Sequence, residues 1–224
     1  MRAKDGALRS FGVYARDYGM ELSDRQLELF GLYLNELMRW NEKMNLTGLK
    51  NPERIVIELF LDSLIPGSVI PREGSLLDAG SGAGFPGLPL KILHPALEVY
   101  LLESREKRVS FLRQAVRVMG LTGIDVIQGR IERDSQAFPL DCFRLVTARA
   151  FAPFPQTLRW CSPMLCGGGM LICYLGEHGP ELLAQNRPLV EEERLKVQDV
   201  LSYSLPGKKG MRHAVILRKT APKQ

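Results

Sequence analysis

The feature of this sequence that most restricts its fold is a short apolar run that leads directly into a glycine-dense turn. The segment Leu76–Gly87 contains Leu-Leu-Asp-Ala and then Gly-Ser-Gly-Ala-Gly-Phe-Pro-Gly. Glycine permits positive φ angles and lets a backbone approach a ligand closely. A buried strand that runs into such a turn before a helix is typical of the ligand-binding edge of an open α/β sheet. We therefore predict that a ligand site lies just after Ala79.

The sequence after Gly74 alternates between short apolar runs and amphipathic helical stretches, which is the pattern of βαβ units in a parallel sheet. We predict strands at Ser75–Ala79, Val99–Glu103, Asp125–Gln128, Phe143–Ala148 and Gly169–Leu175. Two later extended runs, Leu195–Leu205 and Met211–Arg218, flank a turn with proline, glycine and lysine and predict an antiparallel hairpin. The expected fold is α/β and Rossmann-like, with a mostly parallel sheet and an antiparallel final hairpin.

The first 66 residues differ, because they show helical periodicity and no hairpin signal. Ser23-Asp24-Arg25-Gln26 is a capping box, and it predicts a long helix that runs to about Glu42. Asn51-Pro52 supplies an N-cap and a first-turn proline for a second helix, which Pro66-Gly67 should end. We expect a helical extension over residues 1–66, an α/β domain over 67–220 and a basic tail end over 221–224.

Composition limits the class of protein. The chain has 224 residues, of which 45% are hydrophobic and 25% charged, as in folded soluble proteins. The longest uncharged stretch, Trp160–Gly176, is interrupted by proline and glycines and is too short to span a bilayer. We therefore expect no membrane segment, and the lack of an apolar leader at the N-terminus favours the cytoplasm.

The four cysteines and three histidines show no metal-binding spacing. We expect no metal site and no disulfide framework, with the cysteines packed in the core.

Positive charge gathers in two places. Residues 201–224 hold six basic and no acidic residues, and residues 103–117 hold five arginines and lysines against two glutamates. Such clusters can neutralise the phosphates of a nucleic acid. They are equally compatible with ordinary solvated helix faces.

Two acids next to the glycine loop bear on its ligand. The spacing Gly82-x-Gly84-x-x-Gly87 fits a dinucleotide-binding motif and keeps a nicotinamide oxidoreductase open. Asp78, at the mouth of the loop, would repel a diphosphate but could accept hydrogen bonds from the ammonium group of S-adenosylmethionine. Glu103, at the end of the next strand, is placed to bind the ribose hydroxyls of either cofactor. These acids and the final hairpin favour a methyltransferase.

A set of motifs in order along the chain resembles the RsmG/GidB family of bacterial 16S rRNA guanosine-N7 methyltransferases. The matching segments are Trp40-Asn41, Asn45-Leu46-Thr47, Leu61-Asp62-Ser63, the loop from Asp78 to Gly87, Glu103-Ser104, Lys107-Arg108, Phe111-Leu112-Arg113, Arg130, Arg149-Ala150-Phe151 and Arg212-His213. The resemblance implies a class I methyltransferase that uses S-adenosylmethionine to methylate N7 of one guanosine in 16S rRNA.

The resemblance also implies roles for single residues. The cofactor would be bound by Asp78, Gly80, Gly82, Gly84, Phe85, Glu103, Ile131, Glu132 and Arg149. Arg149, Lys107 and Arg130 would act on the substrate side, and the partner would be 16S rRNA or the small-subunit particle. We expect a monomer without a metal ion.

The loop after the fourth strand carries no carboxylate, no cysteine and no Asn/Asp-Pro-Pro-aromatic tetrad. This suits N7 of guanine, whose lone pair can attack a methyl group without a general base. Arg149 is then expected to align the base, or alternatively to pair with a sheet-end acid such as Asp141. Phe151 and Phe154 could stack on the guanine, although burial in the core is the more common role of phenylalanine.

Three positions depart from the family pattern. Glu58 and Leu59 replace an Arg-His pair, and Leu175 replaces a lysine. These changes keep open an alternative, an RNA-binding ribosome-assembly factor that retains the cofactor fold with weak or altered methylation.

Overall fold

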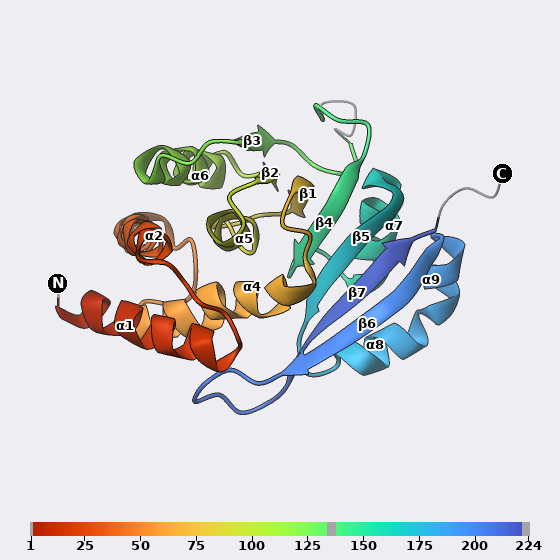
Figure 1. Cartoon of the computed structure of the whole chain (residues 1–224). Coiled ribbons are helices and arrows are strands. Elements are labelled where there is room, and N and C mark those ends of the chain that lie inside the picture. The colour runs from red at the N-terminus through yellow and green to blue at the C-terminus, as the bar shows by residue number, and fades with distance from the viewer. Residues whose placement is uncertain (1, 134–137, 221–224) are drawn as a thin grey trace.

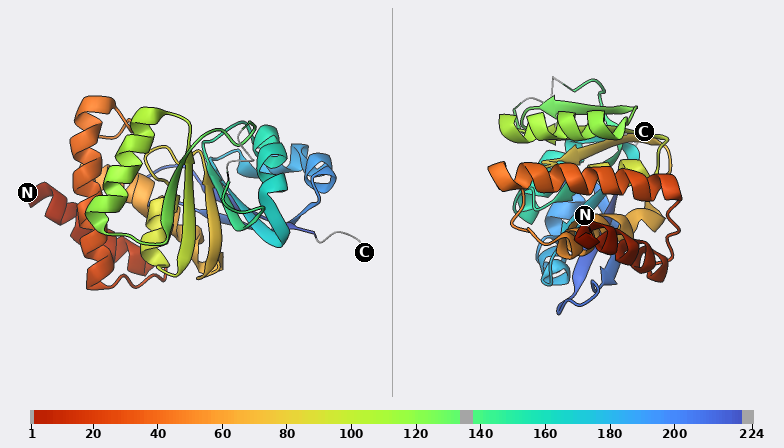
Figure 2. Two further views of the ribbon diagram at one scale, coloured as in Figure 1. Left: turned by 90° about the horizontal axis from the view of Figure 1, so that it is seen from above. Right: turned by 90° about the vertical axis from the view of Figure 1, so that its left-hand side faces the viewer.

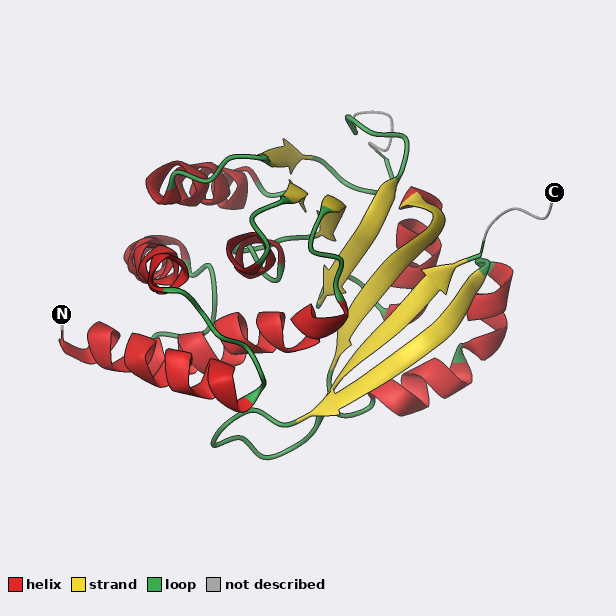
Figure 3. Ribbon diagram, viewed as in Figure 1, coloured by secondary structure: helices red, strands yellow, loops and turns green. Residues whose placement is uncertain are grey.

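The centre of the molecule is a seven-stranded sheet. The computed structural model describes residues 2–133 and 138–220. The strand order is β3-β2-β1-β4-β5-β7-β6, and β7 is antiparallel to both of its neighbours (Figures 1 and 3). The strands are β1 Gly74–Ala79, β2 Leu97–Glu103, β3 Ile124–Gln128, β4 Phe143–Arg149, β5 Leu165–Leu175, β6 Leu195–Tyr203 and β7 Arg212–Lys219. The predicted parallel sheet and terminal hairpin are confirmed, with β5 beginning four residues earlier than expected.

Helices cover both faces of the sheet (Figure 2). One face packs against the extension and against α5 (Gly87–Leu93) and α6 (Glu106–Met119). The other face packs against α7 (Phe154–Cys161), α8 (Gly179–Gln185) and α9 (Arg187–Glu192). Alternate strand residues supply the two cores, as Leu76 and Leu77 do, because successive side chains of a strand point to opposite faces. None of the helices described is long and apolar enough to cross a lipid bilayer.

The extension consists of α1 (Arg2–Asp17), α2 (Asp24–Met44) and a helical segment over residues 52–69. The capping box of α2 is present, with the Ser23 side chain and the Gln26 backbone N–H joined as predicted. The second predicted helix has the expected extent but not the expected type. It passes from α3 (Pro52–Ile55) into the π-helix η1 (Val56–Leu61), then α4 (Asp62–Leu64) and the 3-10 helix η2 (Ile65–Val69).

Aromatic rings join the extension to the sheet domain. Phe60 of η1 packs against Phe11, Phe30 and Tyr33, with ring centroids 5.8, 5.2 and 5.1 Å away. Phe85 of the glycine loop stacks on Tyr33 at 5.4 Å and lies 5.9 Å from Phe60. All five rings belong to one core that continues onto the sheet. The extension therefore packs directly beneath the glycine loop.

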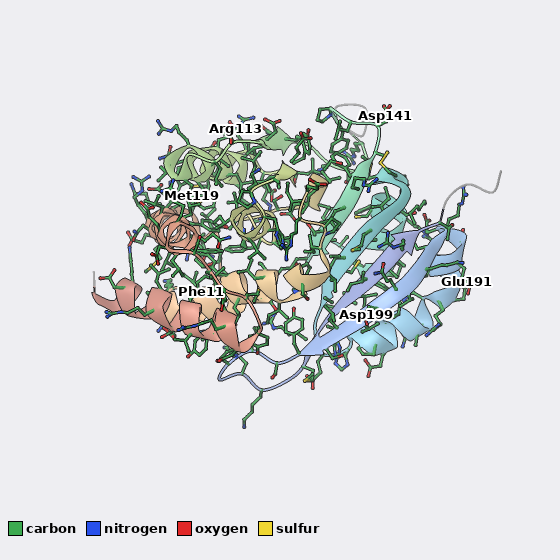
Figure 4. The ribbon with its side chains drawn as sticks, viewed as in Figure 1. Phe11, Arg113, Met119, Asp141, Glu191 and Asp199 are labelled. Carbon is green, nitrogen blue, oxygen red and sulfur yellow. A yellow bond between two sulfur atoms is a disulfide. The ribbon has the colours of Figure 1, made fainter. Side chains whose placement is uncertain are left out.

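The expectation that all four cysteines serve only as packing residues is wrong for one pair. Cys142, next to the labelled Asp141 of Figure 4, forms a disulfide with Cys166. β4 and β5 are parallel neighbours, so residues 24 apart in sequence meet with Cα atoms 5.0 Å apart. Cys161 and Cys173 are free and buried, as expected. The predicted basic tail end, 221–224, lies outside the described residues.

The aromatic cluster generates a stability prediction. Phe60 is fully buried between the extension and the glycine loop, so Phe60→Ala should lower the free energy of unfolding by about 3–5 kcal/mol through lost burial and a cavity. Urea unfolding followed by circular dichroism measures the change. Val13→Ala, on the exposed face of α1, is the control and should change stability little. Equal effects of the two substitutions would contradict the role assigned to Phe60.

Candidate active site

A pocket of about 410 Å³ lies at the carboxyl edge of the sheet. Its walls come from residues at the ends of β1, β2, β3 and β4 or in the loops after them, and from α6 and α7. This is the edge at which open α/β sheets bind ligands. The lining residues include Gly80, Leu102, Glu103, Arg108, Arg130, Ile131, Glu132, Phe151 and Trp160. Four predicted cofactor residues, Gly80, Glu103, Ile131 and Glu132, thus meet in one pocket, and Trp160 is a lining residue that the sequence patterns did not indicate.

Two contacts shape the glycine loop where it borders the pocket. Gly82 has a φ of 60° and donates its backbone N–H to Glu103 Oε2 at 3.0 Å. Gly80 has a φ of 70°, and a Cβ built on it would lie 2.5 Å from the ring of Phe151. Both positions therefore favour glycine for backbone conformation, and Gly80 requires it for space as well.

Glu103 is the acid that lines the pocket. It is buried, and besides Gly82 it accepts the backbone N–H of Arg105 at 2.8 Å and lies 3.6 Å from the Arg108 guanidinium. These contacts hold its carboxylate at the end of β2. The apolar walls of Ile131 and Phe151 stand beside it, and Phe151 packs edge-on against Trp160 at 5.8 Å. A carboxylate that can accept hydrogen bonds from hydroxyl groups, beside apolar walls that can cover a flat ring, fits an adenosine-containing cofactor.

Asp78 is not among the residues that line this pocket, and its predicted contact with a ligand ammonium group stays a prediction. The carboxyl group is fully buried and accepts hydrogen bonds from Gly87 N at 3.1 Å and from the Thr147 hydroxyl at 2.9 Å. Burial raises its pKa to about 6, although the hydrogen bonds from Thr147 and Gly87 and the charge of Arg149 oppose that rise. Asp78 therefore joins β1, β4 and α5.

The position of Asp78 also bears on the oxidoreductase alternative. In a dinucleotide-binding motif the diphosphate sits against backbone N–H groups where the helix begins. In this chain α5 begins at Gly87, whose N–H already donates to Asp78. The buried acid thus occupies the donor that a diphosphate would need and adds an opposing charge.

Arg149 and Phe85 are also not among the residues that line the pocket. The Arg149 guanidinium lies 3.0 Å from an Asp62 carboxylate oxygen and donates to the Glu58 carbonyl at 2.7 Å. It lies 5.9 Å from the centre of the Phe85 ring. Arg149 thus contacts the extension, and its partner acid is Asp62, not Asp141. Its predicted contact with cofactor or base stays a prediction. The π-helix presents the carbonyl groups of residues 58 and 59 to this guanidinium.

Asp62 is a further functional candidate. It lies in the motif Leu61-Asp62-Ser63, but the sequence alone predicted no role for it. It is buried, and besides Arg149 it pairs with Arg212 at 3.2 Å and accepts the Tyr203 hydroxyl at 3.0 Å. Burial and the charge of Asp62 raise the pKa of Tyr203. This Asp62 cluster, Asp62 with Arg149, Tyr203 and Arg212, ties the extension to β4 and to both strands of the hairpin.

The three residues expected to act on the substrate do not converge. Arg130 lines the pocket and lies 3.5 Å from Glu132. Lys107, in the first turn of α6, lines a different hollow against α2. The third predicted cofactor glycine, Gly84, is packed against Tyr33 and Leu88 and is not part of the pocket lining. Only Arg130 of the predicted substrate-side group reaches the pocket.

The departures from the family pattern have partners of their own. Glu58 forms ion pairs with Arg54 and with Lys208 of the hairpin loop, both at 2.7 Å. The hydrogen bonds and charges of these two partners lower the pKa of Glu58, although its partial burial acts in the opposite direction. Leu175, at the end of β5, is half-buried opposite His213.

The raised pKa of Asp78 predicts a pH dependence of stability. The pKa rises from 3.8 to about 6 on folding, so the folded state binds more protons and stability falls as the pH rises through this window. The free energy of unfolding, relative to Asp78→Asn, should drop by about 2 kcal/mol between pH 4 and pH 7. Urea titrations of both proteins across this range measure the difference, and parallel stability curves would refute the assignment.

The buried ion pair between Arg149 and Asp62 predicts that replacing Arg149 lowers stability without lowering ligand affinity. Arg149→Met leaves Asp62 with Arg212 and Tyr203 but removes one buried partner, which should cost about 3 kcal/mol. Because Arg149 is outside the pocket lining, the affinity for S-adenosylmethionine should stay unchanged. Thermal unfolding and isothermal titration calorimetry test the two halves. A large loss of affinity with unchanged stability would restore the direct contact expected from the sequence.

The sequence of the chain matches a known protein family. The family described as rRNA small subunit methyltransferase G matches residues 26–214. A ribosomal RNA small subunit methyltransferase G from Desulfitobacterium hafniense (strain Y51) is 35% identical over 90% of this chain and 84% of its own. One from Roseiflexus sp. (strain RS-1) is 39% identical over 93% and 89%.

The fold has relatives of known structure. The structure of a SAM-dependent methyltransferase from Aquifex aeolicus aligns with a TM-score of 0.59 at 18% identity, covering 78% of this chain and 96% of that one. This likeness shows a Rossmann-like methyltransferase fold. Together with the matches in sequence over most of its length, it shows that the chain belongs to the rRNA small subunit methyltransferase G family.

Proposed function

We propose that the protein transfers the methyl group of S-adenosylmethionine to N7 of a guanosine in 16S rRNA. The observation that carries this proposal is the pocket where Gly80, Glu103, Ile131 and Glu132 meet at the carboxyl edge of the sheet, in a chain of the rRNA small subunit methyltransferase G family. The substrate would be the 16S rRNA or the small-subunit particle in the cytoplasm, and the protein would act as a monomer.

The residues of the pocket suit binding of this cofactor. Glu103, held by Gly82 and Arg105, would accept hydrogen bonds from the ribose hydroxyls. Ile131 and the paired rings of Phe151 and Trp160 would cover the adenine. When bound, S-adenosylmethionine supplies an electrophilic methyl group on its sulfonium.

The choice of N7 is supported by the charges in the pocket. Among the described residues that line it, the acids are Glu103, held by Gly82 and Arg105, and Glu132, paired with Arg130. N7 carries a lone pair and loses no proton when it is methylated, so the pocket needs no unpaired general base. Catalysis then consists mainly of alignment, which can supply about 7–11 kcal/mol when the reacting atoms are well placed.

The target guanosine should lie in an open region of the RNA. In an A-form helix the N7 edge faces a deep, narrow groove that side chains cannot reach. The half-buried Phe151 at the pocket is placed to stack on a base that enters, whereas Phe154 is buried in the core. Arg130, with Arg105 and Arg108 at the same pocket, would meet the RNA there.

Methyl transfer and a matched pair of glycine substitutions test this proposal. The wild type should bind S-adenosylmethionine and transfer labelled methyl to protein-free 16S rRNA, with 7-methylguanosine found after nuclease digestion. Gly80→Ala should abolish binding and transfer, because the new methyl group must displace the Phe151 ring at the pocket. Gly120→Ala has a similar positive φ but meets nothing within 4 Å, so its cost should be limited to backbone strain of about 1–2 kcal/mol.

Three results would contradict the proposal in different ways. Cofactor binding without transfer to any RNA would favour the assembly-factor alternative. Transfer to a guanine atom other than N7 would remove the assigned chemistry. Equal loss of binding in the two glycine variants would separate the cofactor from the Gly80 pocket.

A further inference from the structure

A second hollow, of about 790 Å³, lies between the C-terminal half of α2, the loop over residues 45–50 and the first turn of α6. Its shape is fixed by Asn41, which is buried. The Asn41 side chain accepts the backbone N–H of Thr47 and donates to the carbonyl of Leu49, both at 2.8 Å. Asn45 ends α2 in the left-handed conformation, with a φ of 47°. The loop that forms one wall is therefore held in place without a ligand.

Lysines surround this α2–α6 cleft. Lys43, Lys50 and Lys107 line it, and all three are exposed. Elsewhere on α2, Arg25 and Arg39 pair with glutamates at 2.6 Å. In the described part of the chain, by contrast, none of the three lysines has an ion-pair or hydrogen-bond partner. Glu42 is the single acid among the described lining residues, so the cleft carries a net charge of about +2.

The inner surface of the cleft is apolar. Met38, Met44 and Leu49 line it, are half-buried and pack against the main core. The side-chain amide of Asn45, which also lines the cleft, is exposed. Ammonium groups around an apolar surface match a single-stranded nucleic acid, because phosphates can meet the lysines while a base covers the apolar side chains.

The cleft and the methylation pocket share one helical turn. Arg105 and Arg108 line the pocket, whereas Lys107 lines the cleft. Figure 1 shows α2 and α6 side by side at the end of the molecule opposite the hairpin. A strand that leaves the pocket can therefore cross the start of α6 and enter the cleft, meeting basic side chains along the way. An acidic protein segment could also pair with these lysines. The continuity of the cleft with the pocket favours the RNA, because the same strand would occupy both.

We infer that the α2–α6 cleft binds a single-stranded segment of the rRNA that flanks the target nucleotide, with Lys43, Lys50 and Lys107 on its phosphates. This inference rests on the proposed function and assigns Lys107 to RNA binding, not to the reacting atoms. It also gives a reason for the length of the helical extension, since α2 supplies most of the cleft.

A comparison of two charge-matched double variants tests the inference. Lys43→Gln with Lys50→Gln removes two positive charges at the cleft. Arg187→Gln with Lys196→Gln removes two exposed positive charges on α9 and β6, at the far end of the sheet. Binding of protein-free 16S rRNA to the full-length proteins would be measured between 50 and 300 mM salt, together with S-adenosylmethionine affinity and thermal unfolding.

The cleft variant should bind the rRNA about tenfold more weakly. Its plot of log K against log salt should be shallower by about 1.4, the loss of two single-strand phosphate contacts. Its KM for rRNA should rise while its affinity for S-adenosylmethionine stays the same, and the α9–β6 variant should match the wild type in RNA affinity.

The inference and the proposed function fail in distinguishable ways. Equal rRNA affinity and salt dependence of the two double variants, in a protein that methylates 16S rRNA, would overturn the cleft and leave the activity. So would a cleft variant that loses affinity for an acidic polyaspartate peptide but not for RNA. A wild type that transfers no methyl group to RNA would refute the proposed function itself. A cleft variant with a lowered melting temperature would be replaced by Lys43→Arg with Lys50→Arg, which keeps the charge and should keep wild-type binding if the charges are what matter.

Discussion

The active-site edge of this protein depends on one buried carboxylate. Asp78 has no contact with solvent, so its charge and lone pairs must be satisfied by the protein itself. Its partners are the first backbone N–H of α5 and a hydroxyl group on β4, and together they fix the glycine loop between β1 and α5. An unpaired carboxylate at this depth would be costly. The loop can therefore hold a shape that its glycines, left alone, would not select.

A second buried acid gives the extension its position. Asp62 gathers Arg149, Tyr203 and Arg212 from β4, β6 and β7. The extension thus lies against the carboxyl edge of the sheet through charged groups, as well as through the aromatic core around Phe60. The guanidinium of Arg149 donates its hydrogen bonds to this cluster and to the carbonyl groups of the π-helix. An arginine beside a pocket, in a motif linked to activity, can serve the fold that builds the pocket.

Asp78 and Asp62 are both bound by other protein groups, and neither of them lines the pocket. The described lining of the pocket has apolar walls, two glutamates and three arginines. This set suits the proposed reaction, which needs alignment and no proton acceptor. Further positive charges for a large RNA lie beside the pocket, on the lysines that line the α2–α6 cleft. In the proposed reaction the pocket aligns one atom for methylation, while phosphate contacts outside the pocket supply affinity for the RNA.

Local sequence patterns determined the strands, the terminal hairpin, the capping box of α2 and the glycine loop, because each depends on residues close together in the chain. The same patterns placed Gly80, Glu103, Ile131 and Glu132 at one sheet edge, since the carboxyl ends of parallel strands meet there. Tertiary structure alone decided which groups the side chains of Asp78 and Arg149 contact. It also decided the π-helix at residues 56–61 and the Cys142–Cys166 disulfide. Each depends on a partner brought near by the fold: Thr147 for Asp78, Asp62 for Arg149 and a neighbouring strand for Cys142. The period of a helix or strand is set by adjacent residues, but the partner of a buried charge is set by the packing of distant ones.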